Sequence, residues 1–467
     1  MKTQPTLTAI GLRLEFPAGL HPGAGKDLGN QLIISIDGQG RPVLRGTSLA
    51  GIVRHAYAKF LNLDVNNDKV NAIFGRALDH SQNGGEEQPS RLKVEDLVFE
   101  SKDSTFLRTH NSIDRHRGAV RDQALFSLQM LPPRTAGSTM MWLEDMDPSS
   151  AQKFVSDLAA LFNEGLTMGG NSARGIGLCH LKELRHKTYI LSNIEQHQKA
   201  LDTMYQWRTD RTYSLESTFA FNLAPTQQLR LNFTLSVAPG QDFLIADSNE
   251  MSPQRITTSD NREHWHLPGS SLRGLFRDWC NRLAAREGMS IADHVGHREA
   301  SGKDHGWCFD DQTTQNSKKK RLAEGAPLQD LISCPVSRLF GSLYSRGRIH
   351  ISDAISSKPI KMDTENGDLQ HRMHVAIDMI TGSANEGMLF DNQVIVAREQ
   401  EFAIHILVDQ PELHEAKWLV KCIRALDMGL IRVGSSKASG AMALCGTIEA
   451  KGPHHELFSV LVPSRLN

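Results

Sequence analysis

The chain contains four local patterns that each occur twice, in the same order along its 467 residues. In chain order they are VLRGTSLAGIVRHAY (43–57) with HLPGSSLRGLFRDWC (266–280), IFGRALDH (73–80) with LFGSLYSR (339–346), HNSIDRHRGAVRDQALF (110–126) with HVAIDMITGSANEGMLF (374–390), and GLTMGGNSARGIGL (165–178) with GLIRVGSSKASGAMAL (429–444). Four ordered matches are too many for a chance coincidence of glycines. They indicate two copies of one fold joined head to tail.

The spacing between equivalent positions locates one insertion. It is 223 residues at the first pattern and 264 to 266 residues at the other three. The second copy therefore carries an extra polar stretch near 283–330, which we expect to be a surface excursion. This organisation predicts a first domain over 1–190, a linker over 191–225 and a second domain over 226–467.

Hydrophobic patterning predicts an α+β fold for each copy. Residues 7–16 and 229–237 alternate as strands do, and the Gly-Thr-Ser and Gly-Ser-Ser turns open helices in which a small hydroxyl residue would be the N-cap. Segments 150–166 and 412–430 have helical apolar spacing and end at glycine. Strands with one early and one late helix favour a ferredoxin-like, RRM-like sandwich.

Composition limits where a nucleic acid could bind. Lys and Arg together number 52 and Asp and Glu 53, so only a local basic patch could attract a polyanion. The six cysteines form no CxxC pair, and no apolar run has the length of a signal peptide or a membrane span. We expect a cytoplasmic protein without a membrane partner.

The turns that open the early helices are candidate phosphate sites. Helix N-termini present amide groups and a positive dipole end, and arginines flank both turns. A plain helix cap is the alternative for either turn taken alone. The candidate residues are Arg45, Ser48 and Arg54 in the first copy and Ser270, Ser271, Arg273 and Arg277 in the second.

The glycine-rich segments of the fourth pattern allow close approach of the backbone to a ligand. Neither segment fits a nucleotide-binding fingerprint, and a loop that merely requires small residues is the alternative. The candidate RNA-binding residues are Gly169, Gly170, Asn171, Ser172 and Arg174, with Ser435, Ser436 and Lys437 in the second copy.

Residues 107–123 are strongly basic and lie between alternating segments, which predicts an extended hairpin. Such an arm could lie along RNA with apolar tips between bases, although a solvated charge run is the alternative. Its candidate residues are Arg108, Arg115, Arg117 and Arg121, and the less basic second arm carries His374.

Candidate catalytic and metal-binding residues are fewer. Asp27 and Asp247 lie in the loop after the first strand of each copy, where a carboxylate near RNA could position a metal ion or a 2′-hydroxyl. Either could equally be an ordinary surface acid. His294, His297, Cys308 and Cys334 could supply a zinc site, with buried thiols and exposed histidines as the alternative.

The segments LPGSSLRGLFR, CPVSRLFGSLYSRGRIHISDA and HVAIDMITGSANEGMLF, with the closing glycine-rich loops, resemble the RAMP superfamily. More narrowly they resemble backbone subunits of type III CRISPR effector complexes, and two such domains in one chain resemble the fused type III-D variety. The resemblance implies a subunit that holds CRISPR guide RNA beside other effector subunits. It also implies thumb hairpins, here near 108–130 and 371–396, that kink the duplex with complementary target RNA. An acid after the first strand, best matched by Asp27 and Asp247, would cut that target with Mg²⁺ or another divalent cation.

Three other functions remain open at this point. The chain could be a purely structural RNA-binding backbone subunit, with cutting done by other subunits. It could be a nuclease that processes guide precursors through a histidine, against which the paired arms argue. A metal-binding or carbohydrate-binding protein without RNA would leave the repeat as fold duplication alone.

Overall fold

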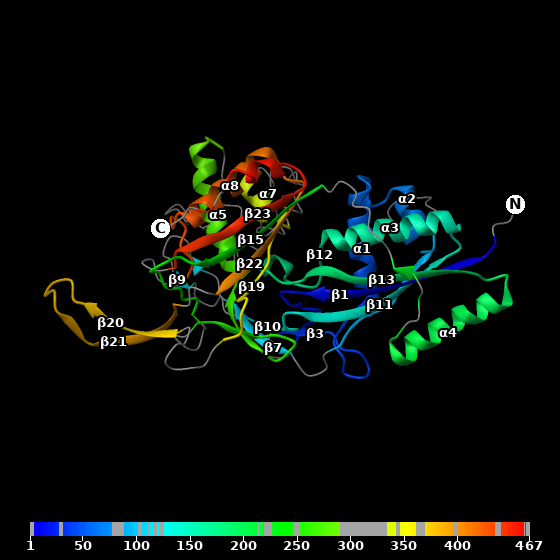
Figure 1. Ribbon diagram of the computed structural model, residues 1–467, viewed down its shortest axis with the longest axis horizontal. Coiled ribbons are helices and arrows are strands. Elements are labelled where there is room, and N and C mark those ends of the chain that lie inside the picture. Colours follow the sequence, from blue (N-terminus) through cyan, green and yellow to red (C-terminus); the bar gives the residue numbers. More distant parts are fainter. Residues whose placement is uncertain are drawn as a thin grey trace, which may run out of the picture.

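The computed structural model describes residues 4–27, 31–76, 88–100, 105–110, 113–114, 119–120, 126–212, 215, 217–218, 227–246, 253–289, 334–341, 346–360, 369–396, 400–434, 440–461 and 463. Two α/β units lie side by side, the first in blue to green and the second in green to red (Figure 1). This arrangement agrees with the repeat, and the mixed α/β content agrees with the expected fold class. The predicted insertion falls almost entirely outside the described residues.

The first copy is built on an antiparallel sheet whose central strands are β1 and β11. The sheet runs in the order β12 (Leu166–Thr167), β13 (Leu178–Ile190), β1 (Thr6–Phe16), β11 (Thr135–Glu144), β6 (Leu97–Phe99) and β4 (Val43–Leu44), with β5 (Leu92–Val94) also pairing β11. Its helices are α1 (Gly46–Phe60), α2 (Asp68–Phe74) and α3 (Pro148–Glu164). Alternate residues of β1, from Ile10 to Phe16, are buried in one core with α1 and α3.

The second copy repeats this order. Its sheet runs β18 (Ile349–Ile351), β22 (Glu401–Asp409), β15 (Gln228–Val237) and β23 (Met442–Lys451), with helices α5 (Gly269–Arg286), α7 (Pro335–Phe340) and α8 (Leu413–Asp427). A smaller sheet holds β16 (Arg255–Thr257), β17 (Glu263–Leu267) and β19 (Ala354–Ile355), and η3 (His455–Phe458) follows β23. The predicted strands 7–16 and 229–237 are β1 and β15, and the predicted late helices are α3 and α8.

Each copy also carries the predicted hairpin. In the first copy, β7 (Phe106–His110) pairs with β10 (Phe126–Met130), beside β2 (Gly23–Lys26) and β3 (Leu32–Ile34), and a short pair β8 (Ile113–Asp114) and β9 (Ala119–Val120) lies between them. In the second copy, β20 (Leu369–Ile377) and β21 (Ala384–Ile395) form a long hairpin that projects from the molecule (Figure 1).

The interval 191–225 contains more than a connection. It holds helix α4 (Ile194–Asp210) and strand β14 (Ser217–Thr218), which pairs with β13 of the first copy. Asn193 caps the start of α4 by accepting a hydrogen bond from the Gln196 amide. The helix packs on the first copy's sheet, at the end of the molecule away from the second copy (Figure 1).

The predicted hydroxyl N-caps of α1 and α5 are wrong. The N-cap residues are Arg45 and Pro268, and neither helix has a cap from the side chain of its own N-cap. A carboxylate from a distant strand takes that role in both copies, as described below.

Candidate nucleic-acid interface

An internal carboxylate occupies the first amide of each early helix. The Gly46 N–H donates to Asp96 Oδ1 at 2.7 Å, and the Gly269 N–H donates to Asp353 Oδ1 at the same distance. A carboxylate at a helix N-terminus is favoured by the helix dipole and satisfies an otherwise unpaired donor. This first amide is therefore not available to an outside phosphate in either copy.

The glycine-rich loop of the first copy approaches the second copy. Residues Ser172–Arg174 form a short 3-10 helix, η1, and the Gly175 carbonyl that follows accepts a 2.7 Å hydrogen bond from the Asp353 amide. Gly175 has φ +96°, and a Cβ placed there would lie 2.1 Å from Asp353 Oδ1. The close approach that the glycines predicted is, at this position, contact with the second copy.

Asp353 is the centre of the contact between the copies. Its carboxylate is ion-paired with Arg108, which lies on β7 of the first copy, and its Oδ2 lies 3.3 Å from His266 Nε2. The side chains of Arg108 and Asp353 are 9% and 2% exposed. Arg108 thus joins the copies from a buried position.

Further arginines lie around this pair. Arg273 donates to the carbonyl oxygens of Ala173, at 2.6 Å, and Phe340. Arg346 donates at 3.0 Å to both Thr167 Oγ1 and Ser172 Oγ. These partners are neutral oxygen atoms, so they orient the two guanidinium groups without cancelling their charge.

The pKa shifts at the junction reflect burial first and the charges of neighbouring residues second. Burial, together with Arg277 and Arg174, lowers the pKa of Arg273 to about 10. Burial also lowers the pKa of His350 to about 4, and Arg273 and Arg346 add to the effect. Burial alone would raise the pKa of Asp353, but Arg108 and His266 hold it below its usual value.

A cleft of about 750 Å³ opens beside these residues, between the two copies. Its lining includes Ser48, His55 and Lys59 from α1, Ser172 from the glycine-rich loop, and Arg346 and His350 from the second copy. We call Arg174, Arg273, Arg277 and Arg346, together with this cleft, the junction site. Arg174 places its guanidinium 4.3 Å from the centre of the Phe126 ring.

Other predicted RNA-binding residues lie outside the junction site. Arg45 pairs with Asp96 at 3.0 Å, and Arg54 donates to Val65 O and Asn71 Oδ1. Gly169 and Gly170 pack on His21. The half-buried Ser270 and Ser271 lie in the first turn of α5.

His374 lies on the projecting hairpin of the second copy, with Nε2 3.2 Å from Asn392 Oδ1. The tip of this hairpin carries two apolar side chains that are open to solvent, since Met379 and Ile380 are 100% and 94% exposed. The equivalent strands of the first copy differ, because β7 faces the junction through Arg108. The two arms of the repeat therefore have different surroundings.

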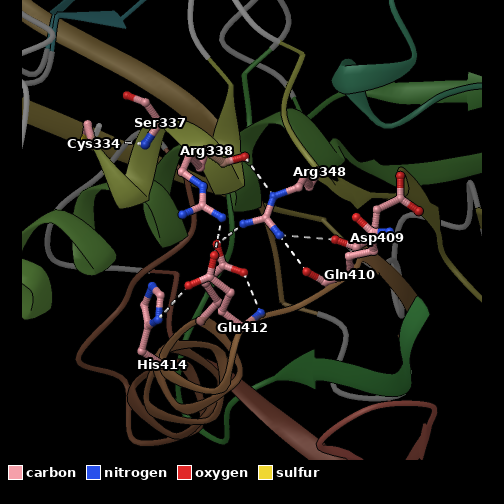
Figure 2. Close-up of polar contacts among 9 residues, drawn as sticks. Cys334, Ser337, Arg338, Arg348, Asp409, Gln410, Glu412 and His414 are labelled. Atoms are coloured by element: carbon pink, nitrogen blue, oxygen red, sulfur yellow. Dashed lines mark hydrogen bonds and ion pairs between the residues drawn. The ribbon is translucent and has the colours of Figure 1, made fainter. Parts of the chain in front are cut away.

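The candidate catalytic and metal residues do not converge in the described part of the chain. Asp27 is exposed after β2, where its Oδ1 accepts a 2.8 Å hydrogen bond from the Gln31 amide. Cys334 is buried at the start of α7, and Figure 2 shows its sulfur accepting from the Ser337 amide beside the ion pair of Arg338 with Glu412. Across the described residues, no group of three or more His, Cys, Asp and Glu side chains could hold a metal ion.

Some predicted residues lie outside the described residues, and the predictions about them stay predictions. They are Asp247, Arg115, Arg117, Arg121, Ser435, Ser436, Lys437, His294, His297 and Cys308.

Sequence reasoning did not select Asp353, Arg346 or His350. One signal was present, because a strand-like segment ending in acid follows the second pattern in both copies, as RLKVEDL and RIHISDA. Those acids are Asp96 and Asp353. Their role could not be predicted, because the sequence does not show that each one accepts a hydrogen bond at the start of the early helix in its copy.

The fold and the junction define a class of tandem α/β proteins whose two copies meet across a cleft flanked by arginines. The family model of the RAMP superfamily matches residues 13–180 and 242–441, one region in each copy. The two regions cover more than half of the chain, which therefore belongs to the RAMP superfamily. No curated protein matches the sequence. None of the helices in the described ranges is long and apolar enough to cross a membrane.

Proposed function

We propose that this chain is a guide-RNA-binding backbone subunit of a type III CRISPR effector complex. Each copy would be a ferredoxin-like, RRM-like domain, and the fusion of two would correspond to the type III-D arrangement. Its partners would be the guide RNA, complementary target RNA and other effector subunits. We expect it to act in the cytoplasm.

The observation that carries the proposal is a pair of oriented arginines at the junction site. Arg273 and Arg346 are held by neutral oxygens, and both lie where the copies meet. A phosphate approaching the cleft would gain charge-assisted hydrogen bonds from guanidinium groups that are already oriented. The chain as a whole is near neutrality, so a local patch of this kind is what RNA binding requires.

The test is the affinity of the full chain for a single-stranded RNA of mixed sequence, measured by fluorescence anisotropy. Arg346→Gln removes one charge from the site, and Arg208→Gln on α4 removes one from an exposed position far from it. We expect Arg346→Gln to weaken binding several-fold and Arg208→Gln to leave it unchanged. Equal affinities for the two variants would contradict the proposal.

The second arm fits the role of a thumb that separates stacked bases. Its exposed tip carries apolar side chains, including Met379 and Ile380. Apolar and aromatic side chains of RNA-binding proteins stack against splayed bases. Met379→Ser with Ile380→Ser should leave guide binding intact and reduce the distortion of a guide–target duplex, as read by 2-aminopurine fluorescence in the target strand.

Cleavage of target RNA is the second candidate function. It is favoured by the exposed position of the Asp27 carboxylate after β2. Asp27 offers one carboxylate, and Mg²⁺ commonly binds through one or two carboxylates plus water and phosphate oxygens. Asp247 would hold the equivalent place in the second copy.

The test is cleavage of complementary RNA by the reconstituted guide complex with Mg²⁺, using Asp27→Asn and Asp247→Asn. Loss of one discrete cut for each substitution would support two cleavage sites. Unchanged cuts with intact assembly would leave the chain as a structural RNA-binding subunit. The exposed pair Arg13 and Glu100 supplies a control, because Glu100→Gln removes a carboxylate elsewhere.

A further inference from the structure

The outer face of the first copy's sheet, turned away from α1 and α3, is covered by α4. Leu7 and Ala9 of β1 and Met140 and Trp142 of β11 are buried there in one cluster. From the linker, Ala200, Trp207 and Leu215 complete that cluster, and Trp207 is fully buried. The first copy therefore has no open outer face on these strands.

The second copy carries polar residues at three of the four equivalent positions. The two central strand pairs have the same register, since Leu7 lies opposite Glu144 as Gln228 lies opposite Asp409. The four covered residues of the first copy therefore correspond, in the same order, to Gln228, Arg230, His405 and Leu407.

This polar outer face is where the first copy sits on the second. Arg230 lies 3.6 Å from Glu164 and donates to Asn163 O at 3.4 Å. The ring centres of His405 and His180 are 6.0 Å apart, edge to face. The same face of the repeat thus receives the neighbouring copy in one case and α4 in the other.

The carboxylates that cap the early helices also have different partners in the two copies. Asp353 of the second copy is paired with Arg108 of the first, across the junction. The equivalent Asp96 of the first copy is paired with Arg45 of its own copy, at the position where the second copy has Pro268. Arg45 thus supplies to Asp96 the positive charge that Arg108 of the neighbouring copy supplies to Asp353.

In the second copy, the arginine equivalent to Arg108 is neutralised by an acid of the same copy. Arg372 is equivalent to Arg108, because Arg108 lies opposite Leu128 as Arg372 lies opposite Asn392. Arg372 is ion-paired with the buried Asp242 of its own copy. The first copy has Gly19 there, since Gly19 O and Asp242 O accept equivalent amide hydrogen bonds from the glycine-rich loops.

We propose that α4, Arg45 and Asp242 close the two ends of this chain, so that the junction between its copies is not repeated between chains. At the outer end of the first copy, α4 and Arg45 take the place of a neighbouring copy. At the outer end of the second copy, Asp242 takes that place by pairing with Arg372. A second copy of the chain therefore does not add head to tail. This inference rests on the repeat and the packing, and does not depend on RNA binding.

The experiment measures mass by sedimentation velocity over a wide range of concentration, without RNA. The wild-type chain should keep the mass of one chain, 51.8 kDa, throughout. In the opened variant, Trp207→Glu releases α4, Met140→His and Trp142→Leu install the residues of the second copy, and Arg45→Pro and Asp242→Asn free the two charges. Its mass should rise with concentration, and adding Arg372→Glu should return it to that of one chain.

Head-to-tail growth of the wild-type chain would overturn the proposal, as would a folded opened variant that stays at the mass of one chain. Hydrogen exchange of the wild-type chain covers the case in which the opened variant does not fold. The amides of α4, and those of β1 and β11 beneath it, should be strongly protected in dilute solution and independent of concentration. Exchange of α4 at the rate of an unfolded peptide would show an open face and contradict the proposal.

Discussion

Arg108 of the first copy and Asp353 of the second form a buried ion pair between residues 245 positions apart in the chain. The same carboxylate caps α5 and lies beside His266. One side chain thus orders a helix start and fixes the two copies against each other.

Removing either member of the pair should destabilise the chain strongly. A buried charge that loses its partner costs about 3–5 kcal/mol, so we expect a loss of this size in the free energy of unfolding for Arg108→Ala. Arg13→Ala breaks the exposed pair with Glu100 and should cost about 0–1 kcal/mol. Urea unfolding of the two variants measures both. Equal losses in the free energy of unfolding would show that the buried pair of Arg108 with Asp353 stabilises the fold no more than an exposed pair does.

Gly175→Ala should weaken the junction. The alanine Cβ would lie 2.1 Å from Asp353 Oδ1, at a backbone φ of +96° that disfavours side chains. We expect a loss of about 1–3 kcal/mol in the free energy of unfolding. Gly274→Ala is the matched control, because that helical glycine of α5 has open space around it, and it should be neutral or stabilise by about 0.5–1 kcal/mol. Thermal unfolding that ranks the two variants the other way would count against the packing described.

Stability should fall as the pH drops from about 6.5 toward 4, and His350 should contribute to the slope. Burial lowers the pKa of folded His350 to about 4, while an unfolded histidine titrates near its usual pKa of 6.5. Between these values the unfolded chain binds more protons, so acidification favours unfolding. Asp353, Arg273 and Arg346 carry the charges that act on the ring, the first favouring its protonated form and the two arginines opposing it.

His350→Gln should make this dependence shallower by up to about 1.4 kcal/mol per pH unit. Urea midpoints at pH 7, 5.5 and 4.5 would show it. His55→Gln, on the exposed face of α1, is the control that should leave the slope unchanged. A slope unaffected by His350→Gln would mean that its ring is not held neutral by burial.

Removing the packing of α4 on the first copy's sheet should lower the free energy of unfolding, even when no self-association follows. Trp207 is fully buried against the first sheet, and truncation of a buried tryptophan costs about 3–5 kcal/mol. Trp207→Ala should therefore lower the unfolding midpoint strongly. Tyr205→Ala on the same helix is the control, because Tyr205 is 70% exposed. Comparable midpoints for the two variants would show that packing of Trp207 against the first copy's sheet contributes little to stability.

Much of the fold could be predicted from the sequence, because it depends on local pattern. Alternation predicted β1 and β15, and apolar spacing with a terminal glycine predicted α3 and α8. The repeat predicted two copies of one fold, and the structure has two α/β units side by side (Figure 1). These inferences need only neighbouring residues.

The candidate site could be predicted only in part, because it depends on residues that are distant in sequence. Asp96 lies 50 residues from the helix start that it caps, and Asp353 lies 84 residues from its own. Periodicity predicts that each lies near a strand end, but not which helix it meets. Ser172 and Arg174 were selected from the glycine-rich loop, whereas Arg346 acquires its importance only because the first copy supplies hydroxyl partners.

The most direct test of the central claim, that RNA lies along the junction between the copies, is photo-crosslinking of a 4-thiouridine-containing single-stranded RNA to the full chain. Peptides identified by mass spectrometry should include those that carry Ser172 or Arg346, and Arg346→Gln should reduce their yield. RNA that binds the chain but crosslinks only to peptides remote from the cleft, such as those of α4 or α8, would contradict the account.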